Sequence, residues 1–115
     1  MDTFLMNDYI DAQVLKMFND EISRELDQEG NEVLLELDSD VFDAPGDDLH
    51  SAFNRYEKEF NVDLSDVNWT PYFPWQNTPL FQRWFKLKRD DVEANRLPLT
   101  VRMFAESAKA GKWLY

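Results

Sequence analysis

Apolar residues recur every three or four positions in three separated stretches of this 115-residue chain. The first stretch spans residues 8–28, the second follows Gly46 and the third follows Thr100. This spacing places the apolar side chains on one face of an α-helix and the polar side chains on the other. Such helices are stable when their apolar faces pack together, so the sequence predicts an all-α bundle of three or four helices.

The first and longest helix is predicted over residues 8–28. Asn7 or Asp8 suits its N-cap, because a short polar side chain accepts hydrogen bonds from the first backbone N–H groups. Gly30 suits its end, because glycine readily adopts the left-handed conformation that stops a helix. The apolar stripe consists of Ile10, Val14, Leu15, Phe18, Ile22 and Leu26.

The other two helices also have recognisable ends. Gly46 or Asp47 is predicted to cap the second helix, whose apolar stripe reaches Phe60. Thr100 is predicted to cap the last helix and Gly111 to end it.

The connections are predicted to be irregular. Residues 31–46 contain a short apolar cluster that suits a strand, but no second strand is apparent to pair with it. We therefore expect a long loop, held to the bundle by Leu35, Leu37, Val41 and Phe42.

A second irregular region precedes the last helix. Three prolines lie within nine residues, among several aromatic residues, and proline disfavours regular structure. Residues 71–97 are therefore predicted to be an aromatic, proline-rich insertion, in which residues 81–87 form a short helix or strand.

Length and composition favour one domain over residues 1–115. The content of 43% hydrophobic and 15% aromatic residues is enough for one packed core. There is no cysteine, which excludes disulfides and thiol chemistry. The first ten residues lack the basic start of a secretory signal, and no apolar run approaches the roughly 18 residues of a membrane span, so a cytoplasmic location is expected.

The net charge of −11 is unevenly distributed. Residues 1–66 hold 19 acidic and 4 basic residues, whereas residues 67–115 hold 4 acidic and 8 basic residues. Ordinary nucleic-acid binding needs a basic surface, so this distribution argues against it. An acidic surface favours solubility and also suits docking of a basic partner.

Catalytic and metal-binding patterns are weak. His50 is the only histidine, and no nucleophile suited to pair with it is apparent, so we expect no enzyme activity. The carboxylates between Asp38 and Asp48 can attract Ca²⁺ or Mg²⁺, but the glycine and final glutamate of an EF-hand are missing. We expect neither a metal nor a cofactor.

The order of these elements resembles an acyl carrier protein. Residues 57–64 resemble the end of that family's second helix, and residues 99–101 resemble the opening of its last helix. A closer resemblance covers most of the chain and is to a small family of uncharacterised bacterial proteins. It rests on residues 60–74 and on the ending at residues 98–113.

The chain departs from the carrier pattern at the site of modification. Carriers have a serine at the start of the second helix, to which the phosphopantetheine group is attached. Aligned from Phe60, that position is Gly46; matched on the motif, it is Asp48. Neither residue has a hydroxyl, so the expected fold lacks the prosthetic group. Ser51 is the nearest hydroxyl, which leaves a carrier modified at Ser51 as an alternative.

The resemblance implies that the second helix docks on partner proteins. We expect a non-catalytic module that contacts a basic partner through Asp43, Asp47, Asp48, Glu57 and Glu59. Two tryptophans near a short basic run are candidate anchors, although aromatic residues here also suit core packing. These tryptophans are Trp75 and Trp84. A second alternative is an acidic decoy of a nucleic-acid-binding protein, suggested by the charge alone.

Overall fold

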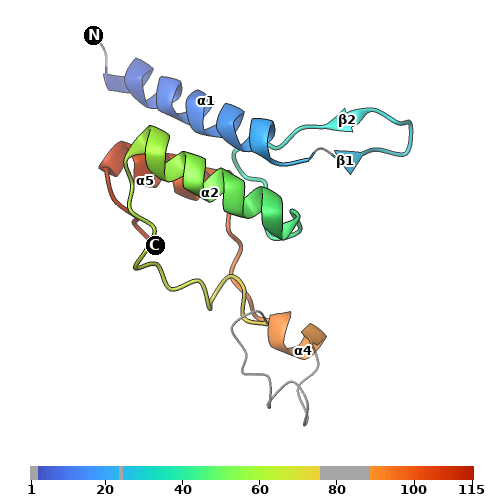
Figure 1. Cartoon of the computed structure of the whole chain (residues 1–115). Coiled ribbons are helices and arrows are strands. Elements are labelled where there is room, and N and C mark those ends of the chain that lie inside the picture. Colours follow the sequence, from blue (N-terminus) through green and yellow to red (C-terminus); the bar gives the residue numbers. More distant parts are fainter. Residues whose placement is uncertain (1–2, 24, 76–88) are drawn as a thin grey trace.

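Three helices dominate the computed structural model, which describes residues 3–23, 25–75 and 89–115 (Figure 1). The first helix, α1, packs against both of the others. The chain is therefore predominantly helical, as its sequence predicted. The three helices are α1 (Thr3–Glu21), α2 (Gly46–Phe60) and α5 (Val101–Ala110).

Smaller elements lie at two places on this bundle. Strands β1 (Glu25–Leu26) and β2 (Glu32–Val33) form an antiparallel hairpin that projects beyond the ends of α1 and α2 (Figure 1). A short helix, α4 (Arg89–Glu93), lies within the region predicted as an insertion. Residues 81–87, predicted as a short helix or strand, lie outside the described part of the chain.

The first helix differs from its prediction at both ends. It begins at Thr3, so Asn7 and Asp8 lie inside the helix rather than at its cap. It ends at Glu21, seven residues before the predicted boundary at 28. Asparagine and aspartate compete with the helix for its backbone hydrogen bonds but can still lie inside it. The helix ends early because a competing turn follows it.

That competing turn belongs to the hairpin. The side chain of Asp27 accepts the backbone N–H of Asn31 at 2.9 Å, and Gly30 adopts a φ of 84°. Aspartate and glycine in these roles stabilise a tight turn, which here overrides helical spacing. The predicted loop over residues 31–46 therefore contains β2, and Leu26 lies exposed on β1 rather than on a helix.

The other two helices follow their predictions closely. Pro45 is the N-cap of α2, one residue before the predicted positions, and no side chain caps this helix. Thr100 caps α5, accepting the backbone N–H of Met103 at 3.4 Å. Gly111 ends α5 with a φ of 77°, as predicted.

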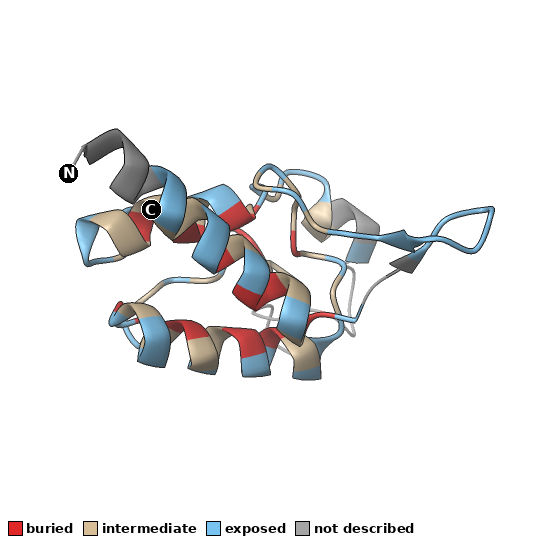
Figure 2. Cartoon of the chain, turned by 90° about the horizontal axis from the view of Figure 1, so that it is seen from above, coloured by how far each residue is buried: buried red, intermediate tan, exposed pale blue. Residues whose placement is uncertain are grey.

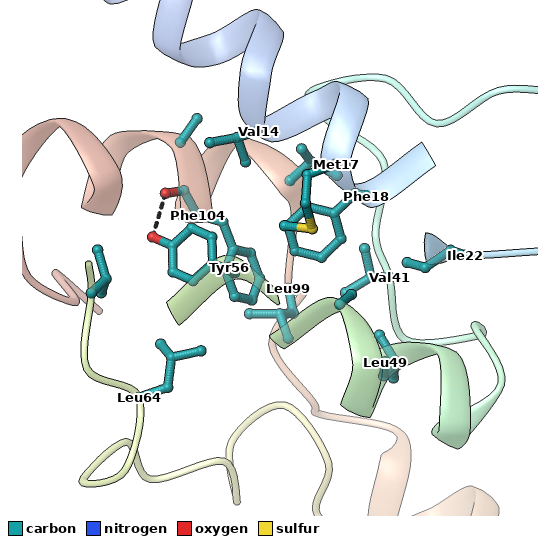
Figure 3. Close-up of a cluster of buried hydrophobic side chains, with 14 of the residues drawn as sticks. Val14, Met17, Phe18, Ile22, Val41, Leu49, Tyr56, Leu64, Leu99 and Phe104 are labelled. Atoms are coloured by element: carbon teal, nitrogen blue, oxygen red, sulfur yellow. Dashed lines mark hydrogen bonds between the residues drawn. The ribbon is translucent and has the colours of Figure 1, made fainter. Parts of the chain in front are cut away.

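The core lies between the three helices, with Phe104 of α5 near its centre (Figure 3). Its ring centroid is 4.8 Å from that of Phe18 and 5.1 Å from that of Tyr56. The Tyr56 hydroxyl donates a 2.7 Å hydrogen bond to the Phe104 carbonyl, and burial raises the pKa of Tyr56. This bond satisfies a polar group that would be costly to bury alone. In Figure 2 the buried segments of the helices face one another.

The chain before α2 runs antiparallel to the chain entering α5. Val41 donates its backbone N–H to Leu99 at 2.9 Å, and Arg102 donates to the carbonyl of Leu37 at 2.7 Å. The side chain of Asn19 fastens the same loop to α1, because its amide both accepts from and donates to the backbone of Leu35. The loop is thus held on two sides and carries its residues to fixed places beside α2.

Candidate docking surface

The carboxylates predicted to dock a partner fall into two groups. Three already have partners within the fold. Asp48 accepts the backbone N–H of Ser23 at 2.9 Å, which joins the start of α2 to the end of α1. This hydrogen bond lowers the pKa of Asp48. Glu57 accepts the backbone N–H of Leu64 at 3.0 Å and so orders the chain after α2.

Glu59, the third of these, belongs to an ion-pair network between α1 and α2. Arg55 donates to Glu59 at 2.6 Å and to Glu21 at 3.1 Å, and its guanidinium lies 3.5 Å from Asp20. These side chains are partly exposed, so each pair adds little stability on its own. Glu59 is nevertheless already paired with Arg55 within the fold.

Asp43 and Asp47 form the second group. Both side chains are exposed, and within the described residues neither makes a hydrogen bond or ion pair. Asp47 lies in the first turn of α2, where the helix dipole favours a negative charge. These two carboxylates are therefore available to an external cation without breaking a contact described in the fold.

An aromatic groove lies beside this second group. It has a volume of about 610 Å³, within the range of ligand-binding clefts. Asp43, His50 and Arg89, which is paired with Glu93, line it together with four aromatic rings, and we call it the α2 groove. Those rings are Phe42, Phe53, Trp69 and Phe73.

The walls of the α2 groove are held by contacts between distant parts of the chain. Phe53 stacks on Trp69 with ring centroids 5.1 Å apart, and Phe42 stacks on Phe73 at 5.8 Å. The guanidinium of Arg96 lies 3.7 Å from the centroid of the Phe42 ring, a favourable cation–π position. These contacts fix the rings before any partner arrives.

Arg96 is fixed in turn by Asp40. One carboxylate oxygen of Asp40 lies 2.8 Å from Arg96, and the other accepts the backbone N–H groups of Phe42 and Leu99. Asp40 therefore stabilises the positions of Arg96 and of Phe42, whose ring lines the groove. It lies only three residues from Asp43, yet its role is internal.

The remaining predicted residues are distributed differently. Ser51 is exposed on α2, and Gly46 at the start of that helix has no side chain. Trp75 is half-buried and does not line the α2 groove, and Trp84 lies outside the described residues. Within the described ranges, no three acidic or histidine side chains lie close enough to hold a metal ion.

The sequence interpretation missed the α2 groove. Its rings come from four places between residues 42 and 73, with no regular spacing to connect them. The proline-rich stretch did signal an aromatic loop, and Trp69, Tyr72 and Phe73 do pack against the bundle. Only the folded chain brings them beside Phe42 and Phe53.

Fold and site together define a predominantly helical domain with an aromatic-lined groove at the start of α2. The chain belongs to the family described as "Protein of unknown function (DUF1493)", whose profile matches residues 6–115. No curated protein and no solved structure matches the chain significantly. Among the described helices, none is long and apolar enough to cross a membrane.

Proposed function

We propose that this protein is a non-catalytic docking module that binds a basic segment of a partner protein at the α2 groove. The observation that carries the proposal is Asp43, whose carboxylate lines the aromatic groove and lacks a described internal partner, as does Asp47 in the neighbouring first turn of α2. Carboxylates attract and orient a basic partner, and buried aromatic contacts supply most of the affinity at such interfaces.

The proposed docking surface is smaller than the one predicted from the acidic residues of the sequence. Asp48, Glu57 and Glu59 already make contacts within the fold, so a partner would have to break those contacts to use them. Asp43 and Asp47 require no such rearrangement. We therefore assign docking to the start of α2 rather than to its whole length.

The proposed module resembles an acyl carrier protein without its phosphopantetheine arm. The start of α2 has no hydroxyl at Gly46, Asp47 or Asp48, and the Asp48 carboxylate accepts from Ser23. A partner is therefore expected to recognise the helix surface and the groove rather than a covalently attached group.

The test is quantitative affinity capture from the source cell. Replacing both Asp43 and Asp47 by lysine should reduce recovery of the specific partner about tenfold or more, because two attractive contacts become repulsive. The matched control replaces Asp8 and Asp66, two exposed carboxylates without a described partner, by lysine. The control has the same change in net charge and should retain the partner.

Two outcomes would contradict the proposal. Equal losses in both variants would mean that net charge alone governs binding and that no docking face exists. Displacement of the partner by added duplex DNA would favour the acidic decoy instead. Raising the ionic strength from about 0.01 M to 0.15 M should weaken binding in the wild type, because screening shortens the reach of exposed charges.

A further inference from the structure

A second open groove lies at the base of the hairpin and is lined in part by the loop that precedes α2. It has a volume of about 520 Å³, and its apolar lining includes Ile22, Val33, Leu34 and Val41. An adjoining cavity of about 460 Å³ shares Asn19, Ile22 and Ser23 with it and is lined further by Leu26 and by two acidic residues, Asp20 and Glu32. We call these two cavities together the arm groove.

The apolar side chains beside the arm groove are unusually exposed. The exposed fractions are 66% for Leu26, 49% for Val33 and 53% for Leu34. Residues 26–34 are exposed throughout, and Figure 2 shows this arm in pale blue beyond the bundle. Single exposed apolar residues are common in folded proteins, but a group of them next to an apolar cavity is typical of a binding surface.

One wall of the groove is already ordered. The Asn19 amide oxygen accepts the backbone N–H of Leu35 at 2.8 Å, and its nitrogen donates to the Leu35 carbonyl at 3.2 Å. This pair of bonds fastens the chain after β2 to α1. A ligand would therefore meet a preformed wall and lose less conformational entropy on binding.

The charge of the arm identifies the kind of partner. Residues 25–36 contain five acidic residues and no basic residue. Asp43, at the far side of the groove, has no described ion pair. Two arms packed against each other would bring acidic residues together, which is unfavourable, whereas lysine or arginine would be attracted.

We propose that the arm groove binds an extended segment of a partner protein in which apolar and basic side chains alternate. An extended chain directs successive side chains to opposite faces. Its apolar side chains then enter the larger cavity, beside Ile22, Val33 and Leu34, and its basic side chains face the exposed carboxylates of Glu36 and Asp43. The arm groove adjoins the α2 groove, since Asp43 and Ala44 line both.

The test uses the isotope-labelled full chain and an acetylated, amidated peptide of three Lys-Val repeats, followed by heteronuclear NMR. Saturable shift changes are expected at Ile22 and at residues 33–41. A peptide of three Glu-Val repeats should cause none. The variant Leu34→Asp should weaken binding of the basic peptide about tenfold or more. Leu97→Asp, at a leucine of similar exposure (52%) outside the arm groove, should stay within about twofold of the wild type.

Each other result would overturn the inference. Equal binding by Leu34→Asp and Leu97→Asp would show attraction by charge alone. Shifts confined to Phe53 and Trp69 would place the peptide in the α2 groove, supporting that site and rejecting this one. Concentration-dependent shifts of the arm without peptide would identify a second copy as the occupant. No shift at all would reject the arm groove and leave the capture experiment on Asp43 and Asp47 to decide the proposed function separately.

Discussion

Asp40 and Asp43 lie three residues apart in the same acidic loop, yet their environments differ. Asp40 pairs with Arg96 and accepts two backbone N–H groups, whereas Asp43 has no such partner in the described structure. The same contrast separates Asp48, which accepts from Ser23, from its neighbour Asp47. An acidic run thus contains both groups that hold the fold together and groups left for other molecules.

The largest expected effect is on stability, when the replacement of Asp40 is compared with the replacement of Asp43. Asp40→Ala leaves Arg96 and two backbone N–H groups without their acceptor, and should lower the free energy of unfolding by about 2–3 kcal/mol. Asp43→Ala should change it by less than about 0.5 kcal/mol, as for most surface positions. Urea unfolding followed by circular dichroism measures both. Similar changes in the free energy of unfolding for the two variants would contradict the different roles given to Asp40 and Asp43.

A smaller effect is expected at the other end of α2. Glu57→Ala removes the acceptor of the Leu64 backbone N–H and should cost about 1 kcal/mol. Glu36 is an exposed glutamate without a described side-chain partner, so Glu36→Ala is the matched control and should be nearly neutral. The measurement is the urea concentration at which each variant is half unfolded. With equal slopes of the two transitions, the difference in this midpoint gives the difference in stability. If Glu57→Ala is as stable as the control, Glu57 is free to dock a partner after all.

Acid stability tests the role of Asp48. The Ser23 N–H lowers the pKa of this carboxyl in the folded state below the value of about 3.9 expected for unfolded aspartate. The resulting stabilisation is present above about pH 4 and is lost as the pH falls through the folded-state pKa. Asp48→Asn should therefore lose stability less steeply than the wild type below about pH 4. Parallel pH profiles from urea unfolding would contradict the assignment.

For the last experiment we expect no change in the protein at all. Incubation with coenzyme A and a broad-specificity phosphopantetheinyl transferase should leave the mass of the protein unchanged, because the start of α2 has no hydroxyl at Gly46, Asp47 or Asp48. Mass spectrometry of the intact protein measures this. A mass increase that disappears in Ser51→Ala would identify a carrier modified at Ser51 and would replace the docking-only proposal.

The sequence by itself determined the helices whose signals are local. Thr100 and Gly111 bound α5 because capping depends on residues within one turn. The apolar stripe of the first helix likewise predicted Val14, Phe18 and Ile22 as core residues, because burial follows helical periodicity. Asp43 and Asp47 were among the acidic residues predicted to dock, although no sequence pattern separates them from Asp48.

Only the tertiary structure decided where α1 ends and which carboxylates remain available. Helical spacing continues to Leu26, but the turn after Asp27 and the pairing of β1 with β2 stabilise a hairpin instead. The α2 groove and the role of Asp40 depend on Arg96, 56 residues away along the chain. A hydrogen bond or ion pair forms where the folded backbone brings two groups within about 3 Å, and no local pattern in the sequence encodes that meeting.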